Sequence, residues 1–126
     1  MTASSPAAAD RVLPQPTTFV VCVQPDRDVV YVKPVGELDL ATAPQLRDEL
    51  HELVAAGFIH IVIDLRALLF IDCAGVRLLV ELNADARRRR WRLSLIQGRE
   101  CVRRVLELTA TVDILPLTAC ARSQVA

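Results

Sequence analysis

The sequence predicts a small α/β domain: a mixed β-sheet of four to five strands, with a mostly parallel core and an N-terminal hairpin, covered by three to four helices. Three observations predict it. The chain has 126 residues, which is enough for one hydrophobic core. Hydrophobic residues make up 52% and charged residues 24%, as in packed domains. Apolar runs of strand length alternate with helical periodicity, which indicates parallel strands joined by crossover helices.

The two ends of the chain are expected to lie outside this domain. Residues 1–17 are rich in Ala, Ser and Pro and lack the basic start and apolar run of a secretory signal. We expect a flexible tail at 1–17, the domain at 18–117 and a C-terminal tail at 118–126. No apolar stretch approaches the roughly 18 residues that span a bilayer, so the expected location is the cytoplasm.

The first elements read as a hairpin. Phe19–Gln24 and Val29–Val35 are β-branched and apolar, which is typical of strands, and the cluster at 25–28 is typical of a turn. Pro34 has no N–H to donate to a ladder, so we expect it at a sheet edge or a bulge.

A helix is predicted next. Thr42 and Gln45 form a capping-box pattern, Pro44 suits the first turn, and Gly57 is expected to end the helix. The apolar stripe of this helix repeats at helical spacing: Leu46, Leu50, Leu53 and Val54.

The rest of the chain continues the alternation. Ile59–Leu65 and Trp91–Ile96 are predicted strands, and a second helix is opened by Asp72. A third helix is predicted from Cys101 to Leu108, followed by a short last strand at Ile114–Leu115.

The segment Leu68–Gly75 joins an apolar strand to a helix and carries the strongest functional signal. A helix start exposes unpaired N–H groups, which makes it a natural site for an anion. Asp72 can satisfy the same groups as an N-cap, and taken alone the segment favours this capping role.

Several motifs, in order, give the sequence a family resemblance. Gly36-Glu37-Leu38-Asp39 comes before Thr42-Ala43 and the first helix, then Ile61–Leu65, then Phe70-Ile71-Asp72 with Gly75, then Trp91–Ile96. With this order and spacing, residues 18–117 resemble the STAS domain family, and within it the bacterial anti-sigma-factor antagonists.

The resemblance implies a binding protein rather than an enzyme, without a cofactor. Such antagonists bind an anti-sigma factor, usually a serine kinase of the GHKL type, and so free a sigma factor. Carried over by position, the partner-binding edge comprises Glu37, Asp39, Asp72, Cys73, Ala74 and Gly75. The implied protein is a monomer or weak dimer.

One departure from the family pattern concerns regulation. The resemblance implies phosphorylation of a Ser or Thr directly before the motif glycine, but this chain has Ala74 there. Ala74 has no hydroxyl, and neither Ser94 in a strand nor Thr42 at a cap is an obvious substitute. We therefore expect an antagonist that its kinase does not switch in the usual way.

The cysteines suggest a different control. Cys73 and Cys101 each lie at a predicted helix start on the same edge of the sheet, a position typical of reactive thiols. We hypothesise a redox switch at Cys73, with Cys22 and Cys120 as further possible partners. The alternative is that Cys73 is a small buried filler.

Other function classes are disfavoured. The formal net charge is zero, which argues against nucleic acid or membrane as partner, and Arg87–Arg90 reads as a solvated helix end. The four cysteines and two histidines, His51 and His60, show no metal-site spacing. No catalytic group is predicted, because the acids Asp39, Asp64 and Asp72 are scattered without a nearby base.

A second function remains open at this point. Another STAS role is a non-switching accessory subunit of a transporter ATPase, or a scaffold in a sensory complex.

Overall fold

The computed structural model describes residues 19–118. The tail expected at 1–17 lies outside the described residues, as does the tail expected at 118–126 except for Thr118, which belongs to the last strand. These residues form a six-stranded sheet. Its strands are β2 (Val20–Asp26), β3 (Val29–Leu38), β4 (His60–Asp64), β5 (Leu68–Ile71), β6 (Arg92–Ile96) and β7 (Leu117–Thr118). The helices are α1 (Ala43–Ala55), α2 (Cys73–Arg89) and α3 (Glu100–Leu108), with a 3₁₀ turn at Leu65–Ala67.

The strand order is β2-β3-β4-β6-β7, and β5 also pairs with β3. Only β2 and β3 are antiparallel, so the predicted hairpin precedes a parallel core. The predicted fold class is confirmed. The additional strand is β5, because the apolar run after the 3₁₀ turn pairs with the end of β3.

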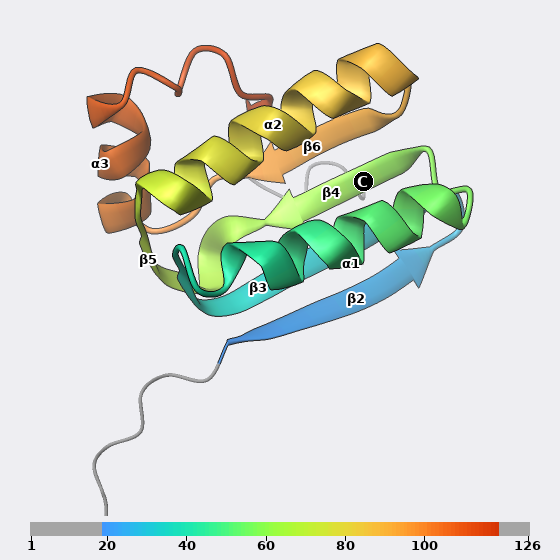
Figure 1. Ribbon diagram of the computed structural model, residues 1–126, viewed down its shortest axis with the longest axis horizontal. Coiled ribbons are helices and arrows are strands. Elements are labelled where there is room, and N and C mark those ends of the chain that lie inside the picture. Colours follow the sequence, from blue (N-terminus) through green and yellow to red (C-terminus); the bar gives the residue numbers. More distant parts are fainter. Residues whose placement is uncertain (1–18, 119–126) are drawn as a thin grey trace, which may run out of the picture.

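Helices α1 and α2 lie side by side across one face of the sheet, and α3 lies at one end, near β5 (Figure 1). The apolar stripes of the helices meet alternate strand residues in a single core. Its most deeply buried members include Val30, Val32, Leu46, Leu50, Ile61, Ile63, Leu79, Leu82 and Leu95. This packing holds the start of α2 rigidly beside the ends of β3 and β5.

Two local predictions are wrong. The capping box does not form, because the Thr42 hydroxyl donates to the Glu37 carbonyl at 2.7 Å instead of capping α1. The last strand begins at Leu117 rather than Ile114, because the N–H of Ile114 bonds to Thr111 in a turn while Leu117 pairs with Leu95 in β6.

Two other expectations have clear outcomes. Pro34 lies in β3, an interior strand, and so not at a sheet edge. It falls between residues 29–32, which pair with β4, and residues 36–38, which pair with β5, two residues before the register shift between Gly36 and Glu37. Arg87–Arg89 form the exposed last turn of α2. Within residues 19–118 no helix is both long and apolar enough to cross a membrane.

Candidate functional site

The two motif segments singled out in the sequence meet at one edge of the sheet. Strands β3 and β5 run parallel, with Glu37 paired to Phe70 and Leu38 to Ile71. Because both strands end here, the loop that follows β3 lies beside the start of α2 (Figure 1). Residues more than 30 positions apart in the sequence therefore form one surface.

Asp72 joins the two segments. One carboxylate oxygen accepts the N–H of Gly75 at 3.0 Å and so caps α2, as predicted. The other oxygen accepts the N–H of Leu40 at 3.3 Å, in the loop after β3. The backbone N–H of Asp72 donates to the Leu38 carbonyl at 3.1 Å. A single side chain thus fixes the helix start relative to the neighbouring loop.

Gly75 allows the helix start to approach β3 closely. A Cβ atom at this position would lie 2.7 Å from Cγ1 of Ile71 and 2.8 Å from the carbonyl oxygen of Leu38. Any side chain would therefore push α2 away from the end of β3.

Asp39 shapes the loop after β3. Its carboxylate accepts the N–H groups of Ala41 and Thr42 at 3.0 and 3.1 Å, and the Thr42 hydroxyl as well. The side chain is half-buried and its hydrogen bonds stay within the loop. Glu37, by contrast, is exposed.

Three apolar side chains are exposed around this edge, and sequence reasoning missed them. Leu40 is 77% exposed at the tip of the loop, and Leu69 and Phe70 on β5 are 45% and 46% exposed. A signal was present, because the run Leu68–Ile71 is apolar at every position. A four-residue strand points side chains to both faces, so such a run exposes some of them unless both faces are covered.

A shallow groove of about 200 Å³ runs between α1 and α2 beside the loop. Ala74, half-buried, lies in its wall. The remaining lining residues combine apolar and charged side chains: Leu40, Ala43, Pro44, Arg47, Arg77, Leu78 and Glu81. The edge is therefore an apolar protrusion next to a groove with a charged rim.

The STAS domain family matches residues 21–122 of this sequence. The chain belongs to the STAS family. No protein with a curated description matches it.

Among solved structures, an anti-sigma factor antagonist from Mycobacterium paratuberculosis is similar, with 25% identity and a TM-score of 0.72 over 86% of this chain and 92% of that one. A putative anti-sigma factor antagonist from Thermotoga maritima has 21% identity and a TM-score of 0.76, over 83% and 91%. SpoIIAA of Bacillus, in its phosphorylated form, has 19% identity and a TM-score of 0.64, over 86% and 96%.

The cysteines of this STAS domain are placed as predicted at two helix starts on the same edge (Figure 1). Cys73 is the first residue of α2 and Cys101 the second of α3, and both are exposed free thiols. The reading of Cys73 as a buried filler is wrong, because the residue sits outside the layer between helix and sheet. The Cys101 thiol donates to the Leu69 carbonyl at 3.5 Å, so Cys101 lies over β5. Cys120 lies outside the described residues.

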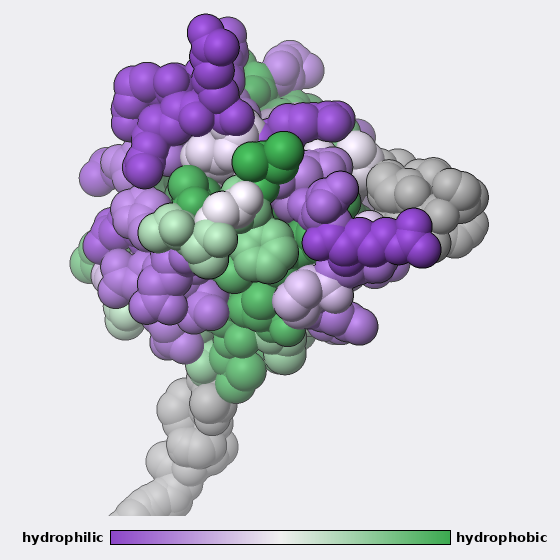
Figure 2. Space-filling model, turned by 90° about the vertical axis from the view of Figure 1, so that its right-hand side faces the viewer, coloured by the Kyte–Doolittle hydropathy of each residue, from purple (hydrophilic) through white to green (hydrophobic). Residues whose placement is uncertain are grey.

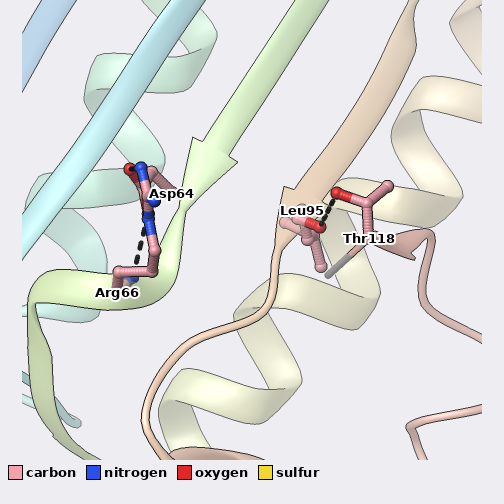
Figure 3. A network of polar contacts seen from close by, with 4 residues as sticks. All are labelled: Asp64, Arg66, Leu95 and Thr118. Carbon is pink, nitrogen blue, oxygen red and sulfur yellow. Dashed lines mark hydrogen bonds and ion pairs between the residues drawn. The ribbon is translucent and has the colours of Figure 1, made fainter. Parts of the chain in front are cut away.

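Two other polar groups lie away from the surface formed by the loop after β3 and the start of α2. Asp64 forms a two-bond ion pair with Arg66, at 2.9 and 2.8 Å (Figure 3). Burial raises the Asp64 pKa, but the hydrogen bonds and charge of Arg66 outweigh it and leave the pKa below its usual value. His60, at the opposite end of β4, lies 3.2 Å from the Ser94 hydroxyl, and its pKa is lowered by burial and by Arg92. These groups do not converge on Asp39 or Asp72.

Figure 2 shows the opposite end of the molecule, where an apolar region in the centre continues to the lower margin, with hydrophilic residues on both sides. Ile59 is 63% exposed there, beside Phe58 and the turn residues Arg27 and Asp28. Nearby, Trp91 is buried and donates its indole N–H to Asp85 at 3.0 Å. Because Asp85 is in the last part of α2 and Trp91 directly precedes β6, this bond holds the end of α2 against the sheet. None of the six residues of the expected partner-binding edge lies at this end.

Proposed function

We propose that this protein is an anti-sigma-factor antagonist that binds an anti-sigma factor in the cytoplasm and so frees a sigma factor. The observation that carries the proposal is the edge fixed by Asp72, which holds the exposed Leu40 beside the start of α2. The similar structure from Mycobacterium paratuberculosis, itself described as an anti-sigma factor antagonist, supports this proposal.

The chemistry of the edge suggests how the partner is held. Leu40 and Phe70 are exposed apolar side chains that gain free energy when a pocket of a partner buries them, and aromatic residues such as Phe70 are enriched at the centres of interfaces. Arg47, Arg77 and Glu81 surround the adjacent groove and are suited to fix orientation. The partner of this edge therefore has an apolar depression flanked by charges of both signs.

Calorimetric titration of the purified protein with each candidate anti-sigma factor, in reductant, tests the proposal. Leu40→Arg is expected to weaken binding at least about tenfold, because it places a charge in a desolvated contact. Ile59→Arg is the matched control, since Ile59 is similarly exposed at the opposite end, and its binding should equal that of the wild type.

The opposite pattern would contradict the proposed edge. Binding lost with Ile59→Arg and kept with Leu40→Arg would move the interface to the other end. Absence of binding to any anti-sigma factor would favour the alternative, an accessory subunit of a transporter ATPase or a sensory scaffold.

We further propose that the antagonist is not switched by phosphorylation at residue 74. Ala74 lies in the groove wall at the position where the family resemblance places the phosphorylated hydroxyl. A phosphate adds about −1.5 to −2 charges and would disrupt a packed interface there. SpoIIAA, which has this fold, is known in a phosphorylated form.

The kinase test uses Ala74→Ser beside the wild type. After incubation with the cognate kinase and ATP, intact-mass analysis should show phosphate on the variant within 65–77 and none there on the wild type. The phosphorylated variant should then lose its partner. Phosphate in that segment of the wild type would contradict the alignment.

Cys73 is the group through which we propose redox control. Its thiol is exposed at the start of α2, between Asp72, which binds the N–H of Leu40, and Ala74. A disulfide with Cys101 would transfer two protons and two electrons to a disulfide oxidant and would tie the first residue of α2 to Cys101 over β5, which changes the shape of the partner edge. Binding measured with and without oxidised glutathione should fall on oxidation in the wild type and persist in Cys73→Ser. Equal binding in both conditions would leave the antagonist without a thiol switch.

A further inference from the structure

The two edges of the sheet differ in length. Strand β7, at one edge, has two residues, and very short edge strands resist pairing with other chains. Strand β2, at the other edge, has seven residues and pairs with β3 without a register shift. Among the described strands, none lies on the outer side of β2. Its outward N–H and C=O groups are therefore a template for another strand.

The features that usually protect an edge strand are confined to one end of β2. Pro25 and Asp26 are its last two residues, whereas Val20–Gln24 contains no charge, proline or bulge. Val20 is 44% exposed, and Val21 and Val23 are half-buried against the core. In Figure 2 the lower margin of the molecule, which β2 forms in Figure 1, is hydrophobic.

Two prolines indicate which residues of β2 point their backbone groups outward. In an antiparallel ladder, alternate pairs exchange both hydrogen bonds, and a pair that contains proline lacks one donor. The pairs with proline are Val21 with Pro34 and Pro25 with Val30. Both involve odd-numbered residues of β2, so Val21 and Val23 direct their N–H and C=O groups away from β3.

We propose that β2 is a dimerisation edge, on which the β2 strand of a second copy pairs antiparallel about Cys22. Cys22 is the midpoint of the uncharged segment Val20–Gln24, and pairing about it leaves Pro25 and Asp26 outside the new ladder. Val21 then bonds to Val23 of the second copy, and Val23 to its Val21. The same patch serves both subunits, as a two-fold axis requires.

The contacts of this arrangement are self-complementary. Val20 faces Gln24 of the second copy on the open side, Val21 faces Val23 on the helix side, and no charge opposes another. The two Cys22 residues face each other in a pair without backbone hydrogen bonds, with Cα atoms about 4.5 Å apart. The partner edge around Asp72 is not used, so the dimer carries two copies of it.

Disulfide trapping tests the pairing and its register in the full-length chain. With Cys73, Cys101 and Cys120 replaced by Ser, diamide takes two protons and two electrons from the two Cys22 thiols, and a covalent dimer is expected on a non-reducing gel. The control adds Cys22→Ser and Val20→Cys, which moves the thiol along the same face of the strand. The two copies of that thiol would be about 14 Å apart, too far for a disulfide. Equal trapping of both variants, or of neither, would overturn the proposal.

A charge test measures the dimer without cross-linking. Cys22 is exposed, so Cys22→Lys should fold normally, yet it sets two like charges opposite each other and should weaken self-association about fivefold. Mixing Cys22→Lys with Cys22→Asp should restore it, as measured by sedimentation equilibrium over a concentration series. A wild-type protein that is monomeric throughout the series, or a Lys variant that associates as well as the wild type, would overturn the proposal.

Discussion

Helices α2 and α3 start at the same edge of the sheet, α2 one residue after β5 and α3 after a three-residue loop that follows β6, yet the two starts are built differently. Asp72 caps α2 with its carboxylate and also binds the N–H of Leu40. The residue at the same position before α3 is Arg99, which makes no side-chain cap hydrogen bond. The proposed partner edge is thus at the start of α2, the helix whose first turn is capped by a side chain.

Both starts also depend on a glycine packed against the preceding chain. At Gly75 the close contacts involve the Ile71 side chain and the Leu38 carbonyl, whereas at Gly98 the closest are backbone atoms of Leu65. The shortest backbone contact is 2.3 Å at Gly98 and 2.8 Å at Gly75, and the other close atom at Gly75 belongs to a side chain, which can shift. The comparison therefore ranks substitutions at the two starts by how readily their neighbours move.

The largest expected effect is at Gly98. In Gly98→Ala the new Cβ would lie 2.3 Å from the carbonyl oxygen of Leu65, so the loop between β6 and α3 must move. We expect a loss of about 3 kcal/mol in the free energy of unfolding, measured by urea denaturation. A loss below about 1 kcal/mol would mean that this loop adjusts freely, and the ranking would be wrong.

Gly75→Ala should cost less stability but more function. The Ile71 side chain can rotate away but the Leu38 carbonyl at 2.8 Å cannot, so the start of α2 shifts relative to Leu40. Because these contacts are longer than the 2.3 Å contact at Gly98, the expected loss is smaller, about 2 kcal/mol. Calorimetry should show weaker binding to the anti-sigma factor at a temperature where the variant is fully folded. Gly98→Ala serves as the control, because a helix shift at α3 leaves the Asp72 connection in place. If Gly75→Ala binds the anti-sigma factor as well as the wild type does, the close packing of Gly75 is not required for partner binding.

The caps themselves give a matched pair. Asp72→Ala removes the bond to the Gly75 N–H and should cost about 1 kcal/mol, whereas Arg99→Ala removes no cap and should cost close to nothing. Thermal denaturation of the two variants measures the difference directly. If the two variants lose equal stability, the hydrogen bond from the Gly75 N–H to the Asp72 carboxylate does not stabilise the fold measurably.

The smallest effect is a gain. Arg99 has the extended backbone of an N-cap, with φ −63° and ψ 159°, so Arg99→Asp can supply the missing carboxylate. We expect a stabilisation of about 0.5 kcal/mol by chemical denaturation, since a capping carboxylate also interacts favourably with the helix dipole. A destabilised variant would show that Arg99 has a role other than ending the loop.

The sequence alone determined the parts that depend on local spacing. Strand and helix periodicity predicted the hairpin, the parallel core and the order of the elements, and Asp72 was correctly assigned as a cap because its position relative to Gly75 is local. The absence of a hydroxyl at Ala74 is also a fact of the sequence. Each of these follows from side-chain chemistry within a few residues.

Tertiary structure decided what depends on neighbours far along the chain. Only the parallel pairing of β3 with β5 brings Leu40 to Asp72, and only the position of the helices leaves Leu40 and Phe70 exposed. The wrong capping box has a more local cause, since the Thr42 hydroxyl bonds to the carbonyl of Glu37, five residues earlier in β3, and periodicity does not show how the loop folds back. Side-chain spacing fixes which face of an element is apolar, but exposure depends on which other element covers that face.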